Sequence, residues 1–432
     1  MPEQSEQAVT KGFMAQRRAA LEQTVNRQQA PPPAQGPTMG SDTQRIRQGD
    51  DMAHISRRTL DIPPFIVMDI LEKAQQMEKA GRDVVHLEIG EPDFTTPPCI
   101  CNAAVKAIAR GETHYTHSLG LLALREAICR HHLQAYGVSV TPEQILVTSG
   151  TSPALFMIFA ALLEPGDEII LSDPHYPCYP NFARFIGAEP VFVRCSEEDG
   201  FQLRADAIQK AVTRRTRAVL INSPANPTGN LLDSDRMKEI AGLGLPIVSD
   251  EIYHGLVYGH PAHSILEFTR NAFVLNGFSK RYAMTGWRLG YIIAPPEFIR
   301  PLQKVQQNLF ISAGSISQWA GVAALEEAAA DVQRMVEIYD ERRRYMIDRI
   351  QKMGFRLPVE PAGAFYLLVN ARHLEEKSYD LAFEILEKAG VGVTPGIDFG
   401  ANVEGYLRFS YANHLDRIKE GLDRLERFIE TR

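Results

Sequence analysis

The chain has 432 residues, 44% of them hydrophobic, which is enough apolar material for a sizeable folded core. A net charge of −7 gives no basic surface for nucleic acid, and the longest uninterrupted apolar stretch, 154–163, is too short to span a bilayer. Five cysteines with no C-x-x-C pair do not suggest a disulfide framework. We therefore expect a cytoplasmic enzyme that binds neither nucleic acid nor membrane.

Residues 1–51 differ in composition from the rest of the chain. The first fifty contain nine glutamines, a single aromatic residue (Phe13) and the Gln-, Ala- and Pro-rich run 28–37. Such a segment cannot bury enough apolar surface to offset the entropy lost on ordering. The sequence therefore predicts a disordered extension over 1–51, or a start codon placed too early, with Met52 as the alternative start.

The first periodic pattern after this segment is helical. Apolar residues recur at helical spacing from Met68 to Ala80, Gly81 follows as a C-terminal glycine, and 84–89 has the composition of a strand. From about residue 102 strands and helices alternate. We expect helices at 102–110, 121–135, 153–163, 203–212 and 233–243, and strands at 145–148, 168–172, 190–193, 218–222, 246–249, 272–275 and 289–294. This alternation predicts βαβ units and a mostly parallel, seven-stranded sheet, hence an α/β fold.

The pattern becomes mainly helical after Pro301. A long amphipathic segment covers about 331–353, strand-like runs follow at 364–369 and 405–410, and the last helix is expected at 416–430. These elements predict a smaller α+β domain beside the α/β one. We expect an N-terminal arm with part of the small domain at 52–101, the large domain at 102–325 and the small C-terminal domain at 326–432.

Ligands in open α/β sheets lie beyond the carboxyl ends of the strands, so the loops that follow strands are the first place to look for chemistry. The strand 145–148 leads into Gly150, Thr151 and Ser152, and Pro153 then opens an apolar helix. Free amides at a helix N-terminus beside two hydroxyls can bind a phosphate, although an ordinary capped helix has the same pattern. The loop matches neither G-x-G-x-x-G nor the Walker P-loop, which disfavours a nicotinamide dehydrogenase or a nucleoside triphosphate enzyme.

Three further loops carry polar residues at strand ends. Asn226 stands in a loop shaped by two prolines and a glycine, where its amide can bind a polar ligand atom. Asp250 ends a buried strand, either as a ligand group or as a cap for the next element. Lys280 follows another buried strand, where lost solvation would lower its pKa and make it a nucleophile, whereas a lone lysine is usually solvated. Arg288, beside a tryptophan, suits a phosphate.

Three motifs in these loops closely resemble the class I/II aminotransferases, which are pyridoxal 5′-phosphate (PLP) enzymes of fold type I. They are S-P-A-N-P-T-G at 223–229, S-D-E-I-Y at 249–253 and S-K-x-x-x-M-T-G-W-R-x-G at 279–290. The motifs stand in the order of the family, and the resemblance covers about residues 52–430. It implies a PLP cofactor and a ping-pong transfer of the amino group of an L-amino acid to a 2-oxo acid, with 2-oxoglutarate as the expected acceptor.

The resemblance implies roles for the residues that match the family's motifs. Lys280 would hold PLP as a Schiff base and later move the substrate proton, while Asp250 would pair with the pyridine nitrogen. The other implied cofactor ligands are Asn226 and Tyr253 at the phenolic oxygen, Thr151, Ser152 and Arg288 at the phosphate with Ser279 as a helper, and Tyr176 stacked on the ring.

Further matches concern the substrate and a second subunit. Arg408 matches the arginine that binds the substrate α-carboxylate bidentately, with Gly90 and Asn226 close to the same group. Tyr115 matches the tyrosine that reaches the cofactor phosphate of the neighbouring subunit, so the resemblance implies a homodimer with shared active sites. The segment 394–400 resembles a small-domain loop that moves on closure.

The chain departs from the family's pattern at Ser152 and Gly277. Some bacterial aspartate aminotransferases have a lysine at the position of Ser152 that reads an acidic side chain, and no clear second arginine stands in this sequence. Aromatic, branched-chain and alanine-like donors therefore stay open beside aspartate. Many relatives have a phosphate-binding serine where this chain has Gly277, so we expect a phosphate site with one hydroxyl fewer.

Alternatives with the same cofactor also stay open. A β-elimination lyase or a decarboxylase of this fold would use the same Lys280 and Asp250. A PLP-sensing transcription regulator is disfavoured because residues 1–50 lack the apolar content of a DNA-binding domain. No metal site is expected, since the cysteines lack metal-ligand spacing, and we expect His131 and His132 to be solvated on their helix.

Overall fold

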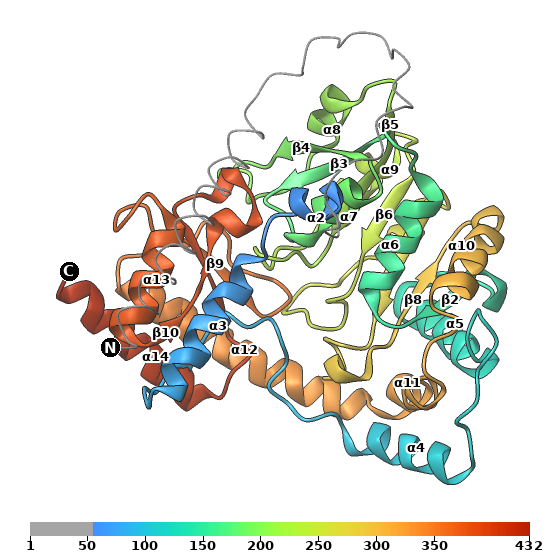
Figure 1. The fold of residues 1–432 in the computed structure, drawn as a ribbon, viewed down its shortest axis with the longest axis horizontal. Coiled ribbons are helices and arrows are strands. Elements are labelled where there is room, and N and C mark those ends of the chain that lie inside the picture. Colours follow the sequence, from blue (N-terminus) through green and yellow to red (C-terminus); the bar gives the residue numbers. More distant parts are fainter. Residues whose placement is uncertain (1–54) are drawn as a thin grey trace, which may run out of the picture. The chain divides into compact units, whose positions relative to one another are not determined.

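The structure, a computed structural model, describes residues 55–432 (Figure 1). The predicted extension 1–51 and the alternative start at Met52 lie outside the described residues. The chain divides into two compact units, Met1–Pro64 and Phe65–Arg432. The described part of the first unit contains the short helix α2 (Arg57–Asp61), and the second unit contains the sheets and all the predicted site residues.

A seven-stranded sheet organises the second unit, in the order β2-β8-β7-β6-β5-β3-β4. Its strands are β2 (Ile145–Thr148), β3 (Glu168–Asp173), β4 (Glu189–Arg194), β5 (Thr216–Asn222), β6 (Ile247–Asp250), β7 (Ala272–Gly277) and β8 (Gly290–Ile293). β8 runs antiparallel to both of its neighbours, β2 and β7, and the other pairs are parallel. The predicted mostly parallel, seven-stranded sheet of an α/β fold is confirmed.

The central strands are buried on both faces, as a sheet covered by helices requires. β6, β7 and β8 are buried along their whole length. Neighbouring residues point to opposite faces, so Val248 and Phe273 belong to one apolar cluster, and Ile247 and Val274 to the other. The polar residues of the site stand where these strands end, beyond the two apolar clusters.

Helices cover both faces of this sheet (Figure 1). On one face lie α6 (Thr151–Leu162), α7 (Cys178–Phe185) and α10 (Pro296–Leu309), and on the other lie α4 (Pro98–Ala109), α5 (Leu122–Tyr136), α8 (Ala205–Ala211), α9 (Ser234–Ala241) and α11 (Ser315–Glu327). α7 is not among the predicted helices, because it spans only eight residues directly after Pro177. α10 contains Pro301, after which the predicted helical region begins. Across residues 55–432 no helix is long and apolar enough to cross a bilayer.

A second group of elements surrounds a three-stranded antiparallel sheet in the order β11-β12-β9. It consists of β9 (Tyr366–Asn370), β11 (Thr394–Pro395) and β12 (Tyr406–Ser410), with helices α3 (Ile66–Lys79), α12 (Ala329–Lys352), α13 (Ser378–Ala389) and α14 (Leu415–Glu430). This arrangement agrees with the expected smaller α+β region. The domain limits 52–101, 102–325 and 326–432 stay a prediction.

The predicted strand 84–89 is shorter in the structure. It appears as β1 (Val85–His86), which pairs in parallel with β10 (Val391–Gly392). Leu87 N still donates to Gly392 O of β10 at 3.0 Å, but Leu87 O accepts Ser410 N at 2.7 Å and Glu88 O accepts Arg408 Nη2 at 2.6 Å. The end of β1 is therefore tied to β12, next to the predicted site.

Candidate active site

A cavity of about 450 Å³ lies at the carboxyl ends of β5, β6 and β7. Eleven of the twelve predicted site residues line it: Gly90, Thr151, Ser152, Tyr176, Asn226, Asp250, Tyr253, Ser279, Lys280, Arg288 and Arg408. The twelfth, Tyr115, does not line the cavity and is 82% exposed. Loops far apart in the sequence therefore meet at one site, as the topology of parallel strands requires.

Lys280 stands just after β7 and lines the cavity. Its Nζ donates a hydrogen bond to Gly90 O at 2.6 Å. Burial lowers the pKa of Lys280 to about 8; the negative charge of Glu91 opposes this shift, and the positive charges of Arg408 and Arg288 add to it. An amine with this pKa is partly neutral near pH 7, and the neutral form is the one that acts as a nucleophile or a base.

Asp250 ends β6 and is buried beside the cavity. Its Oδ2 accepts a hydrogen bond from Tyr179 Oη at 2.6 Å, and its Oδ1 accepts Ile252 N at 3.1 Å. Burial raises the pKa of Asp250 to about 6, and these two bonds and Lys280 oppose the shift. Sequence reasoning missed Tyr179, although its place three residues after Tyr176, close to one helical turn, was a usable signal.

Arg408, on β12, is buried with its guanidinium held by several neighbours. Nη1 donates to Asn226 Oδ1 at 3.0 Å, and Nη2 donates to Glu88 O at 2.6 Å and to Thr394 Oγ1 at 3.1 Å. Its Cζ lies 4.3 Å from the centroid of the Tyr366 ring, and its Nε has no hydrogen-bond partner within residues 55–432. A buried guanidinium whose bonds go to neutral oxygens is suited to an anionic ligand.

The N-terminus of α6 and Arg288 meet at the cavity. Gly150 is the N-cap of α6 with a φ of +98°, and a Cβ built on it would lie 2.6 Å from Arg288 Nη2. A glycine therefore gives the guanidinium the room to lie beside the free N–H groups of the helix. Thr151 and Ser152 stand in the first turn of α6 and line the cavity. A helix N-terminus, a guanidinium and two hydroxyls together make an anion site.

The packing around position 277 explains why this chain has a glycine there. A Cβ on Gly277 would lie 3.1 Å from Ile252 Cδ1 and Leu289 O, and 3.2 Å from Thr151 Cγ2. These separations are tighter than ordinary van der Waals contacts, so a serine would require its neighbours to shift. The expected loss of one hydroxyl from the phosphate site therefore agrees with the packing around this position.

Aromatic side chains complete the polar part of the cavity. The hydroxyls of Tyr253 and Tyr366 lie 2.8 Å apart, and both residues line the cavity. Tyr366 was not predicted as a site residue, and a Cβ on Gly90 would collide with its hydroxyl, which explains the glycine at position 90. Tyr176 lies edge-on to Phe65, with 6.0 Å between the ring centroids.

The cavity also has an apolar wall. Its side chains come from the N-terminal end of α3, from the segment before Gly90, and from α6 and α7: Phe65, Val67, Met68, Leu71, Ile89, Leu155 and Phe182. Sequence reasoning predicted α3 from its periodicity but not that its N-terminal end lines the site. Periodicity identifies the apolar face of a helix and says nothing of what that face meets.

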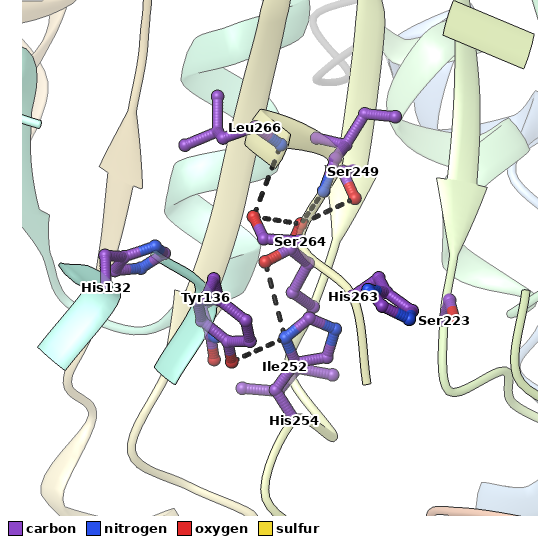
Figure 2. Close-up of polar contacts among 12 residues, drawn as sticks. His132, Tyr136, Ser223, Ser249, Ile252, His254, His263, Ser264 and Leu266 are labelled. Carbon is purple, nitrogen blue, oxygen red and sulfur yellow. Dashed lines mark hydrogen bonds and ion pairs between the residues drawn. The ribbon is translucent and has the colours of Figure 1, made fainter. Parts of the chain in front are cut away.

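A buried polar network lies at the end of β6 and joins the segment after it to α5 (Figure 2). Glu251 Oε1 accepts hydrogen bonds from Ser249 Oγ and Ser264 Oγ, each at 3.1 Å. His254 Nδ1 lies 3.4 Å from Glu251 Oε2 and 2.8 Å from Tyr136 Oη. Burial raises the pKa of Glu251 to about 8 and lowers the pKa of His254 to about 3, so both are mainly neutral near pH 7. Within residues 55–432 no group of His, Cys, Asp and Glu side chains could hold a metal ion.

The prediction that His131 and His132 are solvated is wrong. His132 is fully buried with Nε2 3.2 Å from Tyr291 Oη, and the partly buried His131 accepts a hydrogen bond from Arg281 Nη1 at 2.9 Å. Burial lowers the pKa of His132 to about 4 and the pKa of His131 to about 3, with Arg281 adding to the second shift. The polar face of α5 meets buried polar groups here, so its polarity did not indicate solvent.

The chain is similar to known proteins along most of its length. The family model for class I and II aminotransferases matches residues 82–425. A (5-formylfuran-3-yl)methyl phosphate transaminase from Methanocaldococcus jannaschii is 42% identical to this chain, and the match covers 87% of this chain and 99% of that protein. An aspartate aminotransferase from Geobacillus stearothermophilus is 36% identical, and the match covers 88% of this chain and 99% of that protein. The solved aspartate aminotransferase of Thermus thermophilus with maleate has a TM-score of 0.84 at 36% identity, covering 87% of this chain and 100% of that one. A solved protein from Methanococcus jannaschii, described as similar in its active site to kynurenine aminotransferases, has a TM-score of 0.82 at 41% identity, with the same coverage of 87% and 100%.

The chain therefore belongs to the class I and II aminotransferases. It is a PLP-dependent aminotransferase, since its relatives transfer amino groups and members of this family use PLP. The predicted family, fold, amino-group transfer and cofactor are confirmed. These relatives favour amino-group transfer over the β-elimination, decarboxylation and regulator alternatives.

Proposed function

We propose that the chain transfers the amino group of an L-amino acid with a large apolar side chain, aromatic or branched, to a 2-oxo acid, with 2-oxoglutarate as the acceptor. The observation that carries this proposal is the apolar wall of the cavity. Removing apolar donor surface from water against such a wall favours binding by about 25 cal/mol for each Å². A short donor such as alanine has little surface to bury there.

The charges of the cavity support the same donors. Within residues 65–432, the cations that line it are Lys280, Arg288 and Arg408. We assign the first to the cofactor, the second to its phosphate and the third to the substrate α-carboxylate. No further cation among the described residues that line the cavity is then left for a distal carboxylate, and Ser152 stands where some aspartate aminotransferases have a lysine.

The names of the relatives do not decide the donor by themselves, because they include aspartate aminotransferases and a transaminase of a furan phosphate. One solved relative is described as similar in its active site to kynurenine aminotransferases. Kynurenine carries an aromatic side chain, so this likeness supports an aromatic donor.

The residues at the N-terminus of α6 fit the phosphate of PLP. Gly150 leaves room for the guanidinium of Arg288 beside the helix N-terminus. The charge of the guanidinium and the partial positive charge of the helix N-terminus both favour an anion there. We infer that Thr151, Ser152 and Ser279, which line the same cavity, add hydroxyl donors. When bound, PLP supplies an electron sink that stabilises the charge left by a departing α-proton.

Four further residues fit the ring of PLP. We infer that Asp250 faces the pyridine nitrogen, where its buried carboxylate, oriented by Tyr179, favours a positive charge on that atom. Asn226 and Tyr253 offer an amide and a hydroxyl to the phenolic oxygen, and Tyr176 offers a ring face. The polar groups of the cavity thus match the polar atoms of the cofactor.

Lys280 is assigned the covalent attachment and the proton transfer. The hydrogen bond to Gly90 O fixes its Nζ inside the cavity. With a pKa of about 8, Nζ is available in the neutral form that attaches the cofactor and, once free, accepts the α-proton of the donor. The same amine could return the proton at another atom, and hydrolysis by water would then be needed to release the 2-oxo acid and complete the transfer of the amino group.

Arg408 is assigned the α-carboxylate that donors and acceptors share. Its guanidinium is already fixed by Asn226, Glu88 and Thr394, so little freedom is lost when a carboxylate binds. Because amino acid and 2-oxo acid carry the same carboxylate, one site serves both half-reactions in turn. We therefore expect ping-pong kinetics.

We also propose a homodimer with shared active sites, located in the cytoplasm. Tyr115 is 82% exposed and outside its own cavity, which supports a role at the phosphate of a partner's cofactor. Val105, Ile108 and Leu122, its neighbours in the sequence, are exposed apolar residues suited to a second copy of the chain. Sedimentation of the active enzyme tests this, and a fully active monomer would contradict it.

Steady-state rates with 2-oxoglutarate and a panel of amino donors test the proposed function. We expect parallel double-reciprocal plots, and a higher kcat/KM for phenylalanine, tyrosine or leucine than for alanine or aspartate. A highest kcat/KM for aspartate would contradict the proposed donor class. A 2-oxo acid product formed without consumption of the acceptor would contradict transamination.

A further inference from the structure

Asp398 caps helix α3 from a distant part of the chain. It lies on the 3₁₀ turn η4 (Gly396–Phe399), where its Oδ1 accepts Ile66 N at 3.1 Å and its Oδ2 accepts Val67 N at 3.3 Å, 332 and 331 residues away along the chain. The N-cap residue of α3 is Phe65, whose apolar side chain cannot accept a hydrogen bond. A remote carboxylate therefore supplies the cap that the helix sequence does not.

The capped end of α3 is the end that lines the active site. Phe65, Val67, Met68 and Leu71 are four of the seven residues of the apolar wall. Met68 N bonds to Phe65 O at 3.0 Å, so with the two bonds to Asp398 the first three N–H groups of α3 all have partners. The direction of the first turn, and with it the position of these side chains, depends on this set of bonds.

The segment that carries Asp398 is fixed to other parts of the cavity. The Phe399 ring centroid lies 4.9 Å from Arg408 Cζ, and Thr394 Oγ1 accepts Arg408 Nη2 at 3.1 Å. Phe399 O accepts His175 N at 2.9 Å, one residue before the aromatic side chain assigned to the cofactor ring. Asp398 therefore connects α3 to the carboxylate-binding residue and to the cofactor loop.

Burial of the Asp398 carboxyl disfavours its charged form. Burial raises the pKa of this carboxyl to about 7, against the hydrogen bonds from Ile66 and Val67 and the charge of Arg408, while Asp69 adds to the rise. An apolar residue would fill the same space without a buried charge. What an aspartate provides at this position, and an apolar residue would not, is the pair of hydrogen bonds to the N-terminus of α3.

We propose that Asp398 is a specificity-determining positioning residue that, by capping α3, holds the apolar wall against the donor side chain. The inference rests on the proposed function, because it takes the apolar wall to be the donor subsite. Asp398 acts through α3 and is assigned no contact with substrate or cofactor.

The test compares Asp398→Ala and Asp398→Asn with a matched control in the holoenzyme. The control is Asp233→Ala, because Asp233 caps α9 through Arg236 N at 2.8 Å and lies outside the cavity lining. One readout is hydrogen exchange at the backbone amides of Ile66 and Val67. The other is the ratio of kcat/KM for phenylalanine to that for alanine, in which effects on the shared α-carboxylate cancel.

For Asp398→Ala we expect exchange at these amides to rise about 5-fold and the donor ratio to fall about 5-fold, the usual effect of a lost helix cap. Asp398→Asn retains one acceptor and should show smaller changes, and Asp233→Ala should change neither readout. Unchanged exchange in Asp398→Ala would overturn the capping role, and faster exchange with an unchanged donor ratio would overturn the specificity role.

A variant that fails to fold and a failure of the proposed function can both be told apart from a failure of this inference. If Asp398→Ala does not fold, the same readouts on Asp398→Asn decide. If the wild type shows no preference for apolar donors, the proposed function fails, and the specificity role of Asp398 fails with it. The exchange measurement then still tells whether the carboxylate caps α3.

Discussion

The polar part of the cavity and its apolar wall are built in opposite ways. Lys280, Asp250 and Arg408 lie at or near strands, and each makes a hydrogen bond of 2.6 Å to a neighbour. The apolar wall comes largely from the N-terminal end of α3, with single residues from α6 and α7, so its position depends on how these helices pack. The position of the reactive groups therefore depends on the sheet. The choice of donor depends instead on where α3 lies.

Removing the central group of the polar part should have the largest effect. Lys280→Ala deletes the amine assigned to cofactor attachment and proton transfer, so we expect kcat to fall by about 1,000-fold or more. The visible absorbance of lysine-bound cofactor should disappear as well. Spectra and single-turnover rates of the purified variant check both results, and near-normal turnover would contradict the role of Lys280.

The carboxylate-binding residue should come next. Arg408→Gln removes a buried charge from the site of the α-carboxylate, which we expect to cost about 3 kcal/mol, roughly 100-fold in kcat/KM. The loss should be similar for every donor, because all donors share this group. Arg408→Lys keeps the positive charge but cannot bind the carboxylate with two parallel hydrogen bonds. Its kcat/KM should therefore lie between those of the wild type and Arg408→Gln. A loss restricted to one class of donors would place Arg408 at the side chain instead.

A change in the apolar wall should be smaller and selective. Phe65→Ala is expected to lower kcat/KM about 10-fold for phenylalanine and less than about 2-fold for alanine, because only the larger donor buries surface there. Phe185→Ala is the matched control, since Phe185 lies on α7, is 36% exposed and does not line the cavity. Equal losses for both donors would show that Phe65 has only a structural role.

The network at the end of β6 should affect stability rather than donor choice. Burial raises the pKa of Glu251 from 4.5 to about 8, so the stability that its neutral form contributes is present below pH 4.5 and is lost as the pH rises to about 8. Glu251→Gln does not titrate. The stability of the wild type relative to the variant should therefore fall between these limits, by at most about 1.4 kcal/mol per pH unit. Urea unfolding at pH 5.5 and pH 7.5 measures this difference, and an increase with pH would contradict a neutral Glu251.

The polar part could be predicted from the sequence because each of its groups belongs to a short motif. Asp250 ends a strand, and Lys280 and Arg288 stand in the loop that follows one, so the same few residues determine the backbone and the position of the side chain. The central strands were also predictable, since burial on both faces gives continuous apolar runs.

The wall and its cap could not be predicted in this way. Phe65 lines the cavity only because α3 packs beside it, and the contact between Asp398 and Ile66 joins residues 332 positions apart. The two-residue strands β10 and β11 exist through their pairing with distant strands. His132 contacts Tyr291, which lies on another element, so its burial does not follow from the pattern of its own helix. Each of these features is set by tertiary packing rather than by local pattern.

The most direct test of the account is a pair of single-turnover half-reactions of the wild-type enzyme, with phenylalanine and with aspartate, followed through the cofactor spectrum. The account predicts a kcat/KM for phenylalanine at least about 10-fold above that for aspartate. An equal or higher value for aspartate would contradict it, because a cation outside the described cavity lining would then have to bind the distal carboxylate.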